Sequence, residues 1–163
     1  MKIESQRIGS LEVDDSSLIE FPSGLVGLPT RRRFVILEFD ADVPMAWMQN
    51  VDDSEFGLPV ADAGIFVRDY RIEVPRKDVA ELELDSLEDA VMLVVTTIHQ
   101  GGIMVTGNLR APLVVNLTNR RGRQIVLDRP DLDLRALVDP VAFSNAQRTP
   151  GAEPVPTQEP VSS

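Results

Sequence analysis

The sequence contains no cysteine and only one histidine, and these two absences exclude several kinds of chemistry. Without cysteine there is no disulfide, no thiolate nucleophile and no cysteine-ligated zinc site. A single histidine also excludes the two-histidine HExxH zinc motif. We expect this residue, His99, to be exposed in a turn beside Gly101 and Gly102, without a catalytic partner. A cysteine-free chain is compatible with a reducing compartment, and we expect a cytoplasmic location.

Long apolar runs and glycine-rich phosphate-binding patterns are missing as well. The longest apolar run, Val91 to Val95, is far shorter than the roughly 20 residues that span a bilayer. The opening MKIESQRIGS lacks the apolar segment of a secretory signal. No P-loop, Rossmann or G-x-S-x-G pattern is present. We therefore expect no cofactor, no metal site and no contact with a membrane.

Carboxylates are abundant in the sequence, and they leave open the alternative of an enzyme or a ligand-binding module. The cluster Asp52-Asp53-Ser54-Glu55 lacks the ligand spacing of an EF-hand loop, so we interpret it as a solvated turn. A carboxylate acid/base pair cannot be recognised from sequence, because it depends on proximity in space. A small β-barrel enzyme or ligand-binding module that uses Asp52, Asp53 and Asp69 therefore remains an alternative to a non-enzymatic protein.

The charge is strongly negative and unevenly distributed. The formal net charge is −10, which argues against direct binding to nucleic acid and favours attraction to basic partners. Residues 38–89 hold 15 acidic and 4 basic residues, whereas residues 110–129 hold five arginines and one aspartate. We expect the acidic stretch to form a surface that steers a basic protein toward this chain.

Twelve prolines and ten glycines divide the chain into many short β-rich runs. Their spacing predicts a mainly β fold, a small antiparallel β-barrel-like single domain, with one short acidic helix over residues 75–90. The expected strands are Lys2–Arg7, Leu11–Val13, Ser17–Phe21, Arg33–Phe39, Ala46–Val51, Leu58–Val60, Ile65–Val67, Arg71–Val74, Ala90–Ile98, Ile103–Thr106, Leu113–Leu117 and Gln124–Leu127.

The most strongly marked local feature is a hairpin in residues 107–127, GNLRAPLVVNLTNRRGRQIVL. The apolar runs PLVVNL and QIVL flank the basic turn TNRRGR, in which Gly122 suits a positive φ. Asn116 and Asn119 are expected to bond backbone groups. The residues expected in the core are Val114, Leu117, Ile125 and Leu127.

The residues before this hairpin are expected to form an exposed sheet edge. Gly102, Gly107 and Pro112 make a regular central strand difficult over residues 103–110. We expect Asn108, Leu109 and Arg110 to be exposed there and available to a partner, although an ordinary strand bend would explain them equally well.

The C-terminal part changes in character. We expect a domain over residues 1–128, a weakly packed extension over 129–143 and a disordered proline-rich tail over 144–163. The tail, SNAQRTPGAEPVPTQEPVSS, has too few apolar residues to offset its ordering entropy.

Four stretches, taken in order, resemble the FliW family of bacterial flagellar assembly factors. The opening MKIESQRIGSLEVDDSSLIEFPSGLVGL resembles the family's first strands and its F-P-x-G-x-x-G-F turn, with Leu28 in place of Phe. The run WMQNVDD resembles its W-[LM]-Q-[SN]-x-D-[DP] signature. The dipeptide DY and the acidic helix after it also fit. NLRAPLVVNLTNRRGRQIVL resembles N-L-x-A-P-[IL]-V-[IV]-N…[RK]-x-G-x-Q-[VI]-[IV]-L.

The resemblance implies a small, largely antiparallel β-barrel-like protein that is not an enzyme. It implies two partners, flagellin and CsrA, a basic dimeric translational repressor that binds RNA. In this scheme free flagellin occupies the FliW protein, and secretion of flagellin releases it to antagonise CsrA allosterically and relieve repression of flagellin synthesis. The alternative is a flagellin chaperone or adaptor that does not bind CsrA. The partner-binding residues expected on this chain are Asp78, Glu81, Glu83, Asn108, Leu109 and Arg110.

Overall fold

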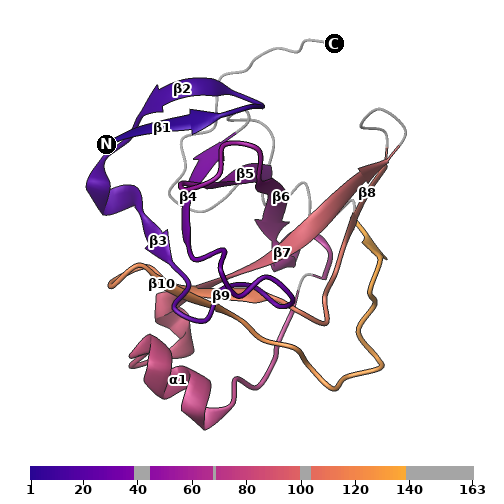
Figure 1. The fold of residues 1–163 in the computed structure, drawn as a ribbon. Helices are drawn as coiled ribbons and strands as arrows, with labels where there is room; N and C mark the ends of the chain where they lie inside the picture. Colours follow the sequence, from indigo (N-terminus) through magenta and orange to yellow (C-terminus); the bar gives the residue numbers. More distant parts are fainter. Residues whose placement is uncertain (39–44, 68, 100–103, 139–163) are drawn as a thin grey trace, which may run out of the picture.

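The fold is a ring of short strands with one α-helix at its lower end (Figure 1). The computed structural model describes residues 1–38, 45–67, 69–99 and 104–138. The strands are β1 (Lys2–Ser5), β2 (Gly9–Glu12), β3 (Ile19–Glu20), β4 (Arg33–Glu38), β5 (Met45–Asn50), β6 (Gly57–Asp62), β7 (Ala90–His99), β8 (Met104–Gly107), β9 (Leu113–Asn116), β10 (Arg121–Gln124) and β11 (Ala136–Leu137). Helix α1 spans Arg76–Leu82, and single 3₁₀ turns cover Asp15–Ser17, Ala63–Ile65 and Leu87–Asp89.

The ring closes because the long strand β7 pairs with several neighbours along its length. The order is β7-β6-β5-β4-β3-β10-β9, and β9 returns to β7 through the pairs Ala90 with Asn116 and Leu93 with Leu113. The far half of β7 pairs with β8, and β11 adds to β8. These pairings are antiparallel except β3 with β10. The prediction of a mainly β, largely antiparallel domain with one short acidic helix is confirmed.

The core has two parts, separated by strand β9. Phe21 and Phe34 meet edge to face inside the ring, with ring centroids 5.6 Å apart. Ile65, Phe66 and Leu82 belong to the second part, to which α1 contributes. All four residues of β9 are buried. Leu113 and Val115 pack in the part of the core inside the ring, whereas Val114 packs in the second part. This arrangement explains why PLVVNL is a continuous apolar run.

Several expected elements are wrong in position or type. Residues 65–67 and 71–74 are not strands; the 3₁₀ turn Ala63–Ile65 ends at the residue where the first was expected to begin. The helix ends at Leu82, well before residue 90, because Glu83 adopts a left-handed conformation with φ 57°. Phe39 and Ile103, expected at strand ends, lie outside the described residues, as does the expected tail over 144–163.

The hairpin turn lies earlier than its composition indicates. Strand β10 begins at Arg121, and the positive φ, 60°, belongs to Arg120 rather than to Gly122. Gly122 lies inside the strand, where an added Cβ would be 2.7 Å from the Phe21 ring. The glycine is therefore required by close packing. Of the expected core residues, Val114 and Ile125 are buried and Leu127 is partly buried, but Leu117 is 51% exposed.

Residues after 128 contribute to the same core as the ring. Leu132 and Ala136 are buried in the second part of the core. Strand β11 pairs with β8, so residues 103–110 do not form the exposed edge that we expected. His99 is the last residue of β7 and is partly buried beside Thr106, not exposed in a turn. Among the described residues, no helix has the length and apolar character needed to cross a membrane.

Candidate protein-binding surface

Three of the expected partner-binding residues lie on or next to α1, which packs against β10. Pro75, at the N-cap, precedes the helix, and Asp78 points into the protein rather than to solvent. The Asp78 side chain is 5% exposed and forms an ion pair with Arg123, with Nε and Oδ1 2.5 Å apart. The ion pair with Arg123 is therefore what compensates the charge of this buried oxygen. Asp78 is therefore not available to another protein.

Arg123 also joins α1 to the loop that follows β3. Its Nη1 lies 3.1 Å from Oε1 of Glu81 and donates to Oγ of Ser23 at 2.8 Å. The neighbouring Gln124 accepts a hydrogen bond from the backbone N–H of Val26 at 2.8 Å. Strand β10 thus ties the FPSGLVGL loop to the helix.

Two asparagines and an arginine hold the C-terminal end of α1. Nδ2 of Asn116 and Nδ2 of Asn119 donate to the Leu82 carbonyl at 2.9 and 3.0 Å. Arg121 lies 3.5 Å from the carboxylate of Glu83. Helix carbonyls at this end lack intrahelical partners and favour donors and cations. The prediction that Asn116 and Asn119 bond backbone groups is confirmed.

The basic and acidic stretches of the sequence are therefore largely partners of each other. Arg121 and Arg123 pair with the helix, and Arg129 pairs with Asp131 at 2.7 Å. Arg120 donates to the Ser17 carbonyl, and Arg110 to those of Pro130 and Leu132. All five arginines of residues 110–129 are thus engaged within the protein.

The other three expected contact residues also have structural roles. Leu109 is 2% exposed, so the prediction that it is accessible is wrong. Oδ1 of Asn108 accepts the backbone N–H of Arg110 at 3.0 Å. The hydroxyl of Tyr70 donates to the Leu109 carbonyl at 2.7 Å, and burial raises the pKa of Tyr70 to about 12, although the charge of Arg129 opposes the rise.

The exposed residues on and just after α1 include Arg76, Lys77 and Glu83, and they are followed by an acidic patch made of Asp85, Leu87, Glu88, Asp89 and Leu117. Leu87 and Leu117 are 39% and 51% exposed, and the three carboxylates are exposed without an ion-pair partner among the described residues. Leu117 and Asp89 adjoin because Ala90 pairs with Asn116. Ser86 caps the 3₁₀ turn by accepting the N–H of Glu88. Its three acidic residues belong to the acidic stretch that we expected to steer a basic protein, but Leu117 is exposed, whereas the sequence predicts it in the core.

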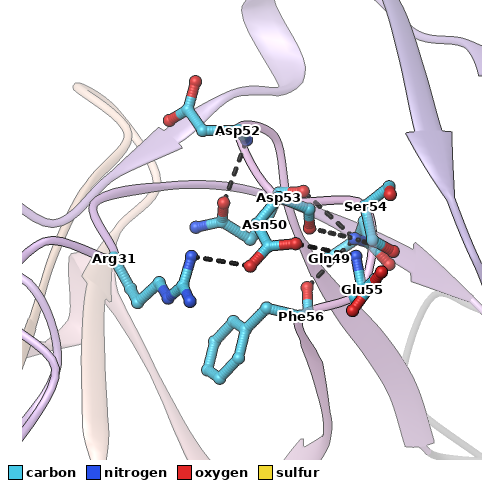
Figure 2. A network of polar contacts seen from close by, with 8 residues as sticks. All are labelled: Arg31, Gln49, Asn50, Asp52, Asp53, Ser54, Glu55 and Phe56. Carbon is cyan, nitrogen blue, oxygen red and sulfur yellow. Dashed lines mark hydrogen bonds and ion pairs between the residues drawn. The ribbon is translucent and has the colours of Figure 1, made fainter.

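The carboxylate cluster at residues 52–55 is a turn organised by one buried amide (Figure 2). Nε2 of Gln49 lies 3.0–3.3 Å from the carbonyl oxygens of Asn50, Asp53, Ser54 and Phe56. Its Oε1 accepts the indole N–H of Trp47 at 2.9 Å. The turn therefore depends on the glutamine of the WMQNVDD stretch.

The aspartates of this turn do not converge as a catalytic pair would. Asp53 pairs with Arg31 at 2.9 Å and Asp52 with Arg33 at 2.5 Å (Arg31 and Asp53 in Figure 2). The hydrogen bond from Arg33 lowers the pKa of Asp52, whereas a carboxylic acid catalyst needs a raised pKa. Asp69 pairs separately with Arg71. No group of three or more potential ligands that could hold a metal ion occurs in the described ranges.

The FliW family model, described as "FliW protein", matches residues 2–138. The chain belongs to the FliW family. The "Flagellar assembly factor FliW" of Natranaerobius thermophilus is 35% identical over 132 residues, which cover 80% of this chain and 87% of the relative. The FliW of Thermotoga maritima is 34% identical over 133 residues, covering 81% and 89%. That of Thermosipho africanus is 30% identical over 138 residues, covering 84% and 95%.

A solved FliW structure confirms the fold. The crystal structure of the flagellar assembly factor FliW superposes with a TM-score of 0.78, covering 86% of this chain and 98% of that one, at 23% identity. FliW membership confirms the resemblance seen in the four sequence stretches. It also makes this chain a flagellar assembly factor and not an enzyme, as we predicted.

Proposed function

We propose that this FliW protein binds flagellin and the translational repressor CsrA in the cytoplasm, and that its binding to CsrA relieves repression of flagellin synthesis. The observation that carries the proposal is the acidic patch. It combines three carboxylates that have no ion-pair partner among the described residues with two exposed leucines. The family membership supplies the flagellar context.

The acidic patch has the two properties that capture of a basic RNA-binding protein requires. Its carboxylates, which are part of the net charge of −10, attract a cationic surface and repel RNA. Leu87 and Leu117 provide apolar anchors that can be desolvated at the centre of a contact, where most binding energy arises. The helix acids Asp78 and Glu81 support the neighbouring structure through Arg123 instead of making the contact.

Charge reversal tests the patch directly. We expect Asp85→Lys/Glu88→Lys/Asp89→Lys to weaken CsrA binding by roughly tenfold or more at low salt, since each exposed charge contact contributes about 0.5–1 kcal/mol. The slope of affinity against salt should also become shallower. Calorimetric titration of the purified protein with CsrA at two salt concentrations measures both quantities.

The matched control reverses three exposed carboxylates elsewhere, Asp14→Lys/Glu20→Lys/Glu55→Lys, and changes the net charge equally. Equal losses in the two variants would show that only the overall charge matters, and would remove the acidic patch from the interface. Flagellin binding without CsrA binding by the parent protein would select the chaperone or adaptor alternative.

A further inference from the structure

The chain continues the pairing of β10 beyond its last strand residue and leaves one edge open. The N–H groups of Ile125 and Leu127 donate to the carbonyls of Pro112 and Arg110 at 3.0 and 2.7 Å. These bonds keep the register in which Gln124 opposes Leu113. Because backbone groups alternate in direction along an extended strand, those of Val126 and Asp128 point to the other side.

An open groove lies between residues 71–75 and residues 126–129. Its volume is about 620 Å³, within the range of protein ligand sites. The lining residues are Arg71, Ile72, Glu73, Pro75, Val126, Leu127, Asp128 and Arg129. Among the described residues, no backbone hydrogen bond crosses the groove, and the N–H groups of Val126 and Asp128 have no partner. Val126 is 65% exposed.

The groove is lined by two arginines and two carboxylates, which differ in whether they already have an ion-pair partner. Its two arginines are already paired, Arg71 with Asp69 at 2.8 Å and Arg129 with Asp131 at 2.7 Å. Glu73 and Asp128 have no ion-pair partner among the described residues. An incoming chain therefore meets the carboxylates of Glu73 and Asp128, an exposed valine and unpaired backbone groups; Glu73 also interacts electrostatically with Arg129.

We propose that this groove binds an extended protein segment in which basic and apolar residues alternate. The segment adds as a strand to the edge at Val126 and Asp128, as in β-augmentation. Its apolar side chains cover Val126, and its lysines or arginines lie beside Glu73 and Asp128. This site is separate from the acidic patch and does not depend on the function proposed above.

Amide hydrogen exchange of the full chain, followed by NMR, tests the proposal. The probe is a short capped peptide of alternating lysine and valine. On saturation, the amides of Val126 and Asp128 should exchange roughly tenfold more slowly, since each gains a hydrogen bond. The amide of Leu127, already bonded to Arg110, is the internal control and should not change. A peptide of alternating glutamate and valine should not bind.

Two variants separate charge from backbone pairing. Glu73→Gln/Asp128→Asn should weaken binding of the lysine peptide several-fold. Asp85→Asn/Glu88→Gln, in the acidic patch, should leave it unchanged. The proposal is overturned if the peptide fails to bind at millimolar concentration, or binds without slowing exchange at Val126 and Asp128. It is also overturned if these amides are already slow in the free protein. Slow exchange that persists on dilution would indicate occupation by the chain's own residues, and slow exchange that disappears would indicate a second copy.

Discussion

Replacing Gln49 with glutamate would place an acid where the turn at residues 50–56 needs a hydrogen-bond donor. Gln49 is 1% exposed, and its amide nitrogen faces four carbonyl oxygens at 3.0–3.3 Å. A carboxylate in this position has no hydrogen to donate and would be repelled by the carbonyl dipoles. The glutamate would therefore have to stay protonated for the turn to keep its geometry.

The free energy needed to keep the introduced glutamate protonated determines how much stability the Gln49→Glu variant loses. A free glutamate has a pKa of about 4.3, so keeping it protonated at pH 7 costs about 3.7 kcal/mol, since each pKa unit corresponds to about 1.4 kcal/mol. The pKa in the folded variant is raised above its unfolded value, so this penalty is absent below about pH 4 and grows as the pH rises. We expect the variant to lose roughly 1.4 kcal/mol of stability per pH unit, relative to the parent, between about pH 4.3 and 7.

Urea unfolding of the parent and of Gln49→Glu at pH 5 and pH 7 measures the difference. The control is Gln6→Glu, because it makes the same chemical change at an exposed side chain. We expect the control to stay within about 0.5 kcal/mol of the parent at both pH values. A Gln49→Glu protein as stable as the parent at pH 7, or a loss of the same size at both pH values, would refute the role assigned to the amide.

Three further predictions concern packing, charge and titration. Gly122→Ala should destabilise the protein by about 1–3 kcal/mol in thermal unfolding, because its Cβ would lie 2.7 Å from the Phe21 ring; an unchanged midpoint would contradict this. Arg123→Met should cost about 3–5 kcal/mol in urea unfolding by leaving the Asp78 carboxylate buried and unpaired, and adding Asp78→Asn should restore part of the loss; a double variant no better than Arg123→Met would contradict the pairing. Tyr70, the only tyrosine, should ionise near pH 12 by ultraviolet absorbance, and its contribution to stability should be constant below pH 10 and fall between pH 10 and 12; ionisation near pH 10 in the folded protein would contradict its burial.

The sequence predicts the strand-rich architecture well, because apolar runs and turn residues are local signals. It fails where a residue's role depends on a distant neighbour. The sequence predicts a turn position for Gly122, but the contact that requires glycine there is with Phe21, about one hundred positions away in the chain. Leu109 was expected at a surface that β11 and the residues before it cover.

The charges of the candidate site also depend on contacts between distant residues, which the sequence does not show. The acidic and basic stretches were interpreted as two separate faces, but Arg123 neutralises Asp78 and Glu81 within the protein. Composition gives the sign and amount of charge, whereas only the fold shows which charges are already paired. The acidic patch depends on which carboxylates lack an internal ion pair and on the exposure of Leu117, and both are properties of the fold.

Titration of the full chain with CsrA, in the absence and presence of flagellin, tests most directly whether this FliW protein acts by binding other proteins. We predict micromolar or tighter binding of each partner at low salt, and release of CsrA when flagellin is added. Failure of both proteins to bind under these conditions would contradict the account.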